Sequence, residues 1–340
     1  MTEKKQTIVG RLSSLMLSGF FRLFLFLLLL LLLASLLKPE TFLRAANFKS
    51  MAKQLTEYGL MSFGMTICLI SGGIDLSVVY IANLSSIIAA LFIIRMTPLC
   101  AAPAAAGIAL AAALIALCVG AACGILNGAL ISYLHIPAML ATLGTTQLYL
   151  GLGVVITGGS TVSQIPGPIT TVGNAAVFGV PLVFLVFCVC AVVMTLLMSK
   201  TRFGLRVYMI GTNDKAALFA GLRIKKILIQ TYMLSGIIGA MAGLSTLSRM
   251  NSAKPDYGSS YTIQCILIAV LGGVDPNGGF GSMACVALAV IILQVLSSFL
   301  NMFPSISNFY RDLIWGATLI LVMILNKTLE KRRSEKMRNA

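Results

Sequence analysis

The sequence is poor in charge. Only 10% of its 340 residues are Asp, Glu, Lys or Arg, whereas a soluble domain carries about 25%, because it must cover its surface with groups that water accepts. The low charge also excludes a disordered chain, which has the opposite composition. Lipid is therefore predicted to be the main solvent of this protein.

The rarest residues exclude most enzymatic and metal-dependent functions. His135 is the only histidine, so a His-based triad or a metal site has no partners to build on. The eight cysteines include no C-x-x-C pair and are interpreted as small hydrophobic residues in apolar helices. No G-x-x-x-x-G-K-S/T loop for ATP is present. We therefore expect no catalytic residue, no metal and no cofactor in this chain.

Long apolar segments are what the sequence has in abundance, with 58% hydrophobic residues and a mean hydropathy of +0.97. Because a spanning helix takes about 20 apolar residues, the pattern predicts an all-α integral membrane protein, a polytopic bundle of about ten helices (range roughly eight to eleven). The predicted spans are Leu17–Leu37, Leu55–Ser71, Leu76–Arg95, Ala104–Gly124, Ala138–Ile156, Val177–Met198, Ile227–Arg249, Tyr261–Gly273, Gly281–Asn301 and Phe309–Asn326. The second and eighth are short and flanked by glycine, so they are expected to be broken or not to cross fully.

The first span could instead be a secretory signal peptide, because Lys4, Lys5 and Arg11 precede it. A signal peptide has an apolar core of about 7–15 residues followed by a small-x-small cleavage site. This segment is longer and meets Lys38–Glu40 without such a site. We interpret it as an uncleaved span.

The basic residues predict the orientation. With the N-terminus inside, 17 of the 25 Lys and Arg residues fall on inner segments and 8 on outer ones, as the positive-inside rule requires. Both termini are then cytoplasmic: residues 1–16 form an N-terminal segment, 17–326 the transmembrane domain with a cytoplasmic loop at about 199–226, and 327–340 a basic tail. The net charge of +15 is explained by orientation and by anionic lipid, without nucleic acid.

The first of three polar features is Ser71–Ser77, at the junction of the second and third spans. Gly72 and Gly73 are expected to break the helix. Asp75 is the acidic residue closest to membrane depth, where a charge is costly unless it is paired or reaches water. Two interpretations stay open: Asp75 and Ser77 cap the next helix, or they belong to a conduction path.

The second feature is the basic stretch Lys200–Lys226. Thr212 or Asn213 can cap a short helix, Asp214 suits the dipole of its first turn, and Gly221 can end it. A small, smooth face is expected from Ala216, Ala217 and Ala220. Such a helix would dock into a groove of a partner protein; the alternative is a connector that only sets topology.

The third feature is the glycine-rich turn Leu271–Gly281, between the eighth and ninth spans. Its five glycines permit tight reversals of the backbone. Gly272–Asp275 repeats the Gly-Gly-aliphatic-Asp order of Gly72–Asp75. Such an echo is typical of the internal repeats of transporters, although two similar turns would give it as well.

These three stretches, in this order and spacing, resemble the permease family of bacterial ABC importers for simple sugars and branched-chain amino acids. Ser71–Ser77 resembles the family's S-G-G-I-D-L-S signature, and Phe203–Gly221 is similar to its cytoplasmic R-F-G-R…G-G-N-x-x-A-A…S-G-I segment. Leu271–Gly281 resembles its L-G-G-T…G-G-x-G segment. The similarity covers residues 48–326. The first signature favours the sugar branch (ribose, galactose, arabinose or autoinducer-2).

The resemblance implies two permease chains, forming a homo- or heterodimer in the bacterial inner membrane. It also implies two ATPase subunits that bind ATP and Mg in the cytoplasm, and a periplasmic binding protein that delivers the solute. ATP-driven closure of the ATPase would rock the permease between inward- and outward-facing states. The residues that would couple to the ATPase are Gly211, Thr212, Asn213, Asp214, Ala216, Ala217, Ala220 and Gly221.

Three positions depart from the family pattern. Val79 stands where the family usually has glycine, Thr212 replaces the second glycine of G-G-N, and Val274–Pro276 replaces a polar Thr-Ser run. These departures leave the turn geometry, and with it the substrate, open.

The candidate translocation pathway is taken from polar or glycine positions at membrane depth. These candidates are Gly73, Asp75, Ser77, Asn83, Asn127 and Gln264. The alternative to an ABC permease is an ion-coupled secondary transporter that uses Asp75. Apart from Asp75, the sequence places no Glu or Lys deep in any span, whereas ion coupling usually needs ionisable residues within the membrane. A membrane enzyme would need a cluster of His, Asp, Glu or Cys.

Overall fold

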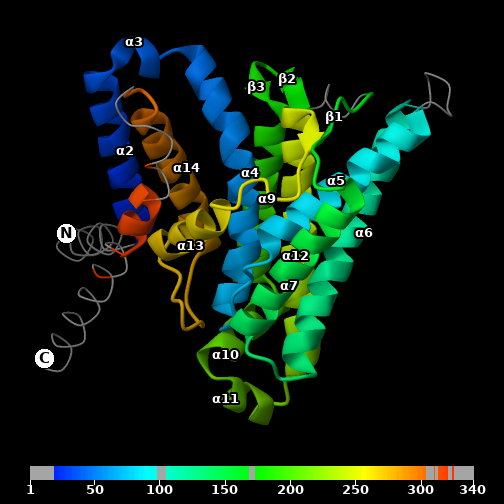
Figure 1. Cartoon of the computed structure of the whole chain (residues 1–340). Coiled ribbons are helices and arrows are strands. Elements are labelled where there is room, and N and C mark those ends of the chain that lie inside the picture. The colour runs from blue at the N-terminus through cyan, green and yellow to red at the C-terminus, as the bar shows by residue number, and fades with distance from the viewer. Residues whose placement is uncertain are drawn as a thin grey trace, which may run out of the picture.

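The computed structural model describes residues 19–97, 105–167, 173–303, 310, 313–320 and 324. This part of the chain is almost entirely helical (Figure 1). It adds two small antiparallel sheets: β1 (Val162–Ser163) pairs with β4 (Ser252–Ala253), and β2 (Ala176–Val177) pairs with β3 (Val180–Pro181). Seven of the described helices are long and apolar enough to cross a membrane. The predicted all-α membrane bundle is confirmed.

Seven predicted spans match these long helices closely in position. They are α2 (Gly19–Leu37), α5 (Val78–Met96), α6 (Ala105–Ser132), α7 (Ala138–Thr157), α9 (Leu182–Lys200), α12 (Ile224–Met250) and α14 (Met283–Leu300). The α6 helix runs past its predicted end at Gly124, because no proline follows before Pro137 and the extension packs Gly128 against Ile229 of α12. Of the tenth predicted span, Phe309–Asn326, the structure describes residues 310, 313–320 and 324, all of them helical, while both terminal segments lie outside the described residues.

The two predicted short spans have different outcomes. The second is part of α4 (Ala45–Ile70), a helix of 26 residues, so its predicted shortness is wrong: the polar segment before Leu55 also folds as helix. The eighth is α13 (Tyr261–Leu271), with 11 residues. At 1.5 Å per residue α13 is about 16 Å long, too short to cross a core of about 30 Å.

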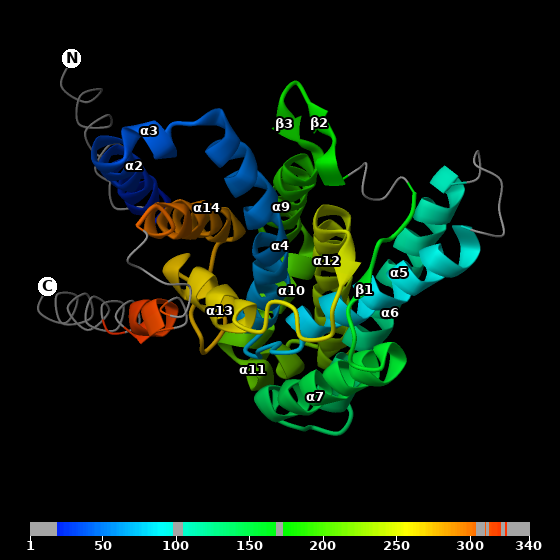
Figure 2. The same cartoon turned by 45° about the horizontal axis from the view of Figure 1, so that its top comes forward.

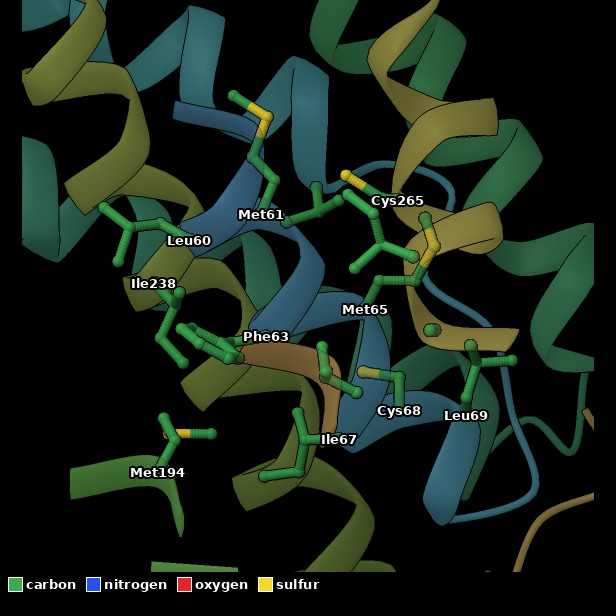
Figure 3. Close-up of a cluster of buried hydrophobic side chains, with 14 of the residues drawn as sticks. Leu60, Met61, Phe63, Met65, Ile67, Cys68, Leu69, Met194, Ile238 and Cys265 are labelled. Carbon is green, nitrogen blue, oxygen red and sulfur yellow. The ribbon is translucent and has the colours of Figure 1, made fainter. Parts of the chain in front are cut away.

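The core is organised around α4. Every residue from Leu55 to Ile70 is buried, as expected for a helix that is apolar on all sides and surrounded by protein. Figure 3 shows its side chains clustered with Met194 of α9, Ile238 of α12 and Cys265 of α13. The α4 helix therefore joins elements that are far apart in the sequence.

The closest helix pairing is that of α6 with α12. A Cβ atom at Gly120 would lie 2.4 Å from the carbonyl oxygen of Gly236, and one at Gly124 would lie 2.2 Å from that of Tyr232. Small residues at this spacing let two backbones approach in lipid, where packing rather than water exclusion drives helix association. The pairing fixes the position of Tyr232 beside the first glycine-rich turn.

Two short helices lie together at one end of the molecule, below the long helices in Figure 1. These are α10 (Arg202–Thr212) and α11 (Asp214–Phe219). The short helix α3 (Pro39–Phe42) lies at the opposite end. In Figure 2, α2 and α14 form one flank and α5, α6 and α7 the other, with α4 and α12 between them. The charge pattern assigns the end with α10 and α11 to the cytoplasm.

Candidate functional site

The three polar features of the sequence meet at one place, which we name the glycine junction and define as Gly72, Gly211, Gly278 and Gly279. The backbone N–H of Gly279 donates to the carbonyl oxygen of Ile70 at 2.9 Å. A Cβ at Gly211 would lie 1.9 Å from that oxygen, and one at Gly278 would lie 2.6 Å from the Cα of Gly72. Only glycine fits contacts this close. The first turn, the cytoplasmic stretch and the third turn are thus in direct backbone contact.

A tyrosine supports the junction from α10. The Tyr208 hydroxyl donates to the carbonyl oxygen of Gly281 at 2.8 Å. Burial raises the pKa of the Tyr208 phenol, so it keeps its proton and remains a donor at neutral pH. This bond ties the cytoplasmic helix to the third glycine-rich turn.

A cavity of about 920 Å³ lies beside the junction, and we name it the inner cavity. Its walls come from the first glycine-rich turn, the connection between α6 and α7, the α10–α11 segment and the start of α12. The lining includes Gly73, His135, Asn213, Asp214, Tyr232 and Asn277. All three motif regions therefore face one space at the cytoplasmic end.

The short cytoplasmic helix has the predicted cap, helix and glycine order. The Oδ1 atom of Asn213 accepts from the backbone N–H of Ala216 at 3.0 Å, so Asn213, and not Thr212, is the cap. The Thr212 hydroxyl instead donates to the carbonyl oxygen of Tyr208. Gly221 has a φ of +79°, the left-handed conformation expected just after a helix.

The face that α11 presents differs from the prediction. Ala217 is buried against the core, at 2% exposure, so the expected smooth face of three alanines is wrong in part. The exposed residues next to it are Leu218, at 60%, and Phe219, at 91%. Ala216, Ala217 and Ala220 do share one side of the helix, but the core takes Ala217 and leaves the other two exposed. The C-terminal end of α11 therefore presents two large apolar side chains, after the exposed charged residues Asp214 and Lys215.

Asp75 is fully buried and hydrogen-bonded on both oxygens. Its Oδ1 atom accepts from the backbone N–H of Ser77 at 3.1 Å and from the Ser77 hydroxyl at 2.7 Å. Its Oδ2 atom accepts from the hydroxyl of Ser235 on α12, also at 2.7 Å. Ser77 stands at the N-cap position of α5 but makes no side-chain cap bond, so the capping prediction is wrong for its hydroxyl.

The Asp75 contacts continue into two further helices. The Asn127 side-chain amide on α6 donates to the Ser77 hydroxyl at 2.7 Å, and the Tyr149 hydroxyl on α7 lies 3.3 Å from Asn127 Oδ1. We name Asp75, Ser77, Asn127, Tyr149 and Ser235 the Asp75 network. A buried carboxylate is costly unless its hydrogen bonds are made; here Ser77 and Ser235 make them, and Asn127 and Tyr149 extend the chain of hydrogen bonds from Ser77 into α6 and α7.

The six pathway candidates do not share one surface. Gly73 lines the inner cavity, whereas Asp75, Ser77 and Asn127 lie in the network. The Asn83 amide donates to the carbonyl oxygens of Pro255 and Tyr257, at 2.9 and 2.8 Å. Gln264 is buried on α13. Asn83 thus fixes an outer loop to α5.

Sequence reasoning missed a second buried acid. Glu57 on α4 is fully buried and pairs with Arg249 at the end of α12, toward the outer end of the molecule. Its Oε2 atom accepts from the Tyr257 hydroxyl at 3.1 Å, with the Tyr261 hydroxyl at 3.5 Å. We name these four residues the outer cluster. The available signal was an acidic residue at the start of an apolar segment, where a buried carboxylate requires a cation or hydrogen-bond donors nearby.

Comparison with known proteins agrees with the motif geometry. A family described as the permease component of the branched-chain amino acid transport system matches residues 47–323. The chain belongs to this permease family. The family match gives no support to the alternative of an ion-coupled carrier. The cysteines of the described residues are all free thiols.

Curated relatives cover most of the permease. The ribose import permease protein RbsC of Bacillus subtilis is 33% identical over 314 residues, which are 89% of this chain and 91% of the relative. The autoinducer 2 import system permease protein LsrD of Photorhabdus luminescens is 33% identical over 273 residues, 78% of each chain. LsrD of Yersinia pseudotuberculosis is 30% identical over 295 residues, 82% of this chain and 85% of the relative. No solved structure matches the chain.

Proposed function

We propose that this permease forms the path by which a simple sugar or sugar-like solute is imported, powered by an ATPase that docks on α10 and α11. The relatives named for ribose and autoinducer 2 support the sugar branch, as does the I-D-L-S order of Ile74–Ser77. ATP and Mg bind to the ATPase, and a periplasmic binding protein delivers the solute at the outer end.

The observation that carries this proposal is the glycine junction. Gly211 lies in the last turn of α10, just before α11 begins at Asp214, and it contacts both Ile70 and Gly279 through backbone atoms. Backbone contacts without intervening side chains transmit a displacement with little loss, because packed interiors are stiff. A partner that moves α11 would therefore move both glycine-rich turns beside the inner cavity.

The docking surface is the apolar tip of α11. Leu218 and Phe219 are exposed at the end that the charge pattern assigns to the cytoplasm. Large apolar and aromatic side chains that enter a pocket of the partner carry most of the energy of a protein interface. We assign ATPase anchoring to these two residues, with Asn213 and Gly221 fixing the helix that presents them.

The second permease chain pairs along α7. Gln147 is exposed on this apolar helix, one turn from Gly144 and Gly151, and a Cβ at either glycine would meet no atom within 4 Å. A side-chain amide that faces lipid lacks hydrogen-bond partners, which favours association with another helix. In this arrangement the solute passes between the two copies and past Gly73, and the Asp75 network holds the Gly73 turn from behind.

The test is co-purification of the tagged permease with a candidate importer ATPase from the same cells, together with uptake of labelled ribose, galactose, arabinose and autoinducer 2. We expect Phe219→Arg to abolish both ATPase recovery and uptake. Phe178→Arg is the matched control, because Phe178 is equally exposed at the opposite end. Equal recovery with both variants would sink the docking assignment, and no ATPase with the wild-type protein would sink the proposed function.

A further inference from the structure

A second pocket, of about 360 Å³, lies where α12 starts at the cytoplasmic end. Its polar lining is cationic. Arg206 projects from α10, while Arg223, Lys226 and Gln230 follow one another along one face of α12. Leu222 and Ile227 supply the apolar part of its wall. We name it the basic pocket.

No carboxylate of the described residues neutralises the basic pocket. The ion pairs of the described residues are Glu57–Arg249 and Lys254–Asp256, and both lie toward the outer end, away from the basic pocket. The N-cap residue Arg223 makes no side-chain cap bond to α12, a helix of 27 residues whose N-terminus adds partial positive charge. Three like charges held close together repel one another, so the pocket favours an anion.

The geometry suits a phosphate group better than a single carboxylate. Arg206 and Arg223 each present a planar fork of donors, which matches the oxygens of a phosphate, and Lys226 adds a point charge. Gln230 offers neutral donors to the ester side. A phosphodiester, whose two non-bridging oxygens share one negative charge, can thus be contacted by four side chains from two helices.

The position of the pocket favours a lipid as the source of that phosphate. The α10 helix exposes Leu205 and Met209, which lie one turn apart on one face next to Arg206, at 62% and 38%. Exposed apolar residues interleaved with Arg are typical of a helix that lies in the membrane interface. From Ile227 onward α12 enters its long apolar run. The pocket therefore lies at the level of lipid headgroups in the cytoplasmic leaflet, where anionic lipids are found.

We propose that the basic pocket binds the phosphate of an anionic phospholipid headgroup, holding α10 against the start of α12. The basic pocket includes Arg206 of α10 and Gly221 after α11, so it borders the segment that docks the ATPase, but it contains neither the anchoring residues Leu218 and Phe219 nor Gly73 of the solute path. A bound headgroup would fix the base of α11, which follows α10 directly.

The test measures the unfolding temperature of the full-length purified permease while phosphatidylglycerol, phosphatidylcholine or inorganic phosphate is added. We expect phosphatidylglycerol to raise it and phosphatidylcholine not to. Arg206→Gln, Arg223→Gln and Lys226→Gln should each weaken the apparent affinity by about fivefold, and the triple variant by on the order of a hundredfold. Arg202→Gln and Lys215→Gln, on the same cytoplasmic surface but outside the pocket, are the matched controls.

Each outcome decides the proposal. If inorganic phosphate gives the same shift with the same sensitivity to the variants, the phosphate site stands and its source is a soluble anion. If the triple variant keeps the wild-type response, or the controls lose it equally, the site does not exist. If the pocket variants keep their lipid response but no longer recover the ATPase, the basic pocket is a protein-docking surface and the proposal fails.

Discussion

At the cytoplasmic end, segments distant in sequence meet through glycine backbones beside an open cavity, whereas at the outer end they meet through the buried pair of Glu57 and Arg249 with two tyrosines. The first kind of contact is made by backbone atoms, so a displacement of one segment is passed on to the others. The second joins α4, α12 and the start of α13 through charge, which resists separation in a low dielectric. The difference indicates that the outer end is the locked end of this structure.

This contrast has a consequence for transport. The inner cavity lies at the cytoplasmic end, so a solute arriving from outside requires the outer end to open. The elements joined by the outer cluster would have to part in that step. Three substitutions test the contrast, and they follow from the largest expected effect to the smallest.

The largest effect is expected from Glu57→Gln. Removing one partner of a buried ion pair leaves the other charge uncompensated, which costs about 3–5 kcal/mol. Because the Arg249 side chain keeps 21% of its exposure, we expect the lower end of that range. Chemical unfolding of the purified permease measures the loss, and the double variant Glu57→Gln/Arg249→Gln should recover part of it.

The matched control for this prediction is Lys254→Gln. It breaks the other ion pair of the described residues, Lys254–Asp256, whose side chains are both about half exposed. A surface pair contributes about 0–1 kcal/mol. If Glu57→Gln costs no more than Lys254→Gln, the outer end is not locked by charge and the comparison between the ends fails.

A smaller effect is expected from Gly211→Ala. The new methyl group would lie 1.9 Å from the carbonyl oxygen of Ile70, and overpacking of this kind costs about 1–3 kcal/mol. Because the clash is with backbone atoms of the glycine junction, we also expect the rate of solute uptake to fall even where the purified variant stays folded. The same measurements on Gly107→Ala give the control, since a Cβ at that helical glycine meets no atom within 4 Å. Unchanged uptake in Gly211→Ala would show that the junction does not carry motion.

The smallest effect is expected from Asn213→Ala. It removes the acceptor for the N–H of Ala216, and the loss of such a cap costs about 1 kcal/mol. Hydrogen exchange at the Ala216 amide should therefore accelerate by about fivefold, while exchange in the outer loop at Tyr257 stays the same. Asn213→Asp should restore protection because its oxygen can cap as well. Acceleration at both ends would mean that the two ends are not independent.

Much of the fold could be predicted from local sequence. The α5, α7, α9, α12, α13 and α14 helices lie close to their predicted spans, and α11 has its predicted cap and terminating glycine. The length of α4 could not be predicted, because its first half is polar enough to resemble a loop. The burial of Ala217 and exposure of Phe219 depend on which face of α11 meets the core.

The site was predicted in parts and not as a whole. The sequence identified all three stretches that form the glycine junction, but it did not predict that their backbones contact one another. It selected Asp75 but left open whether this residue caps a helix or faces the path. It missed Glu57 altogether, because the partner Arg249 lies 192 positions away along the chain.

Sequence by itself determined the membrane-spanning helices and the short cytoplasmic helix α11. In lipid each backbone polar group must be bonded within its own helix, so a local run of apolar residues is enough to specify a span. A cap, one helical turn and a glycine are likewise neighbours along the chain. Tertiary structure alone decided that Gly72, Gly211 and Gly279 share one contact and that Glu57 meets Arg249. Those contacts depend on how the helices pack side by side. The distance between two packed helices is set by both of their surfaces together, so neither local sequence determines it alone.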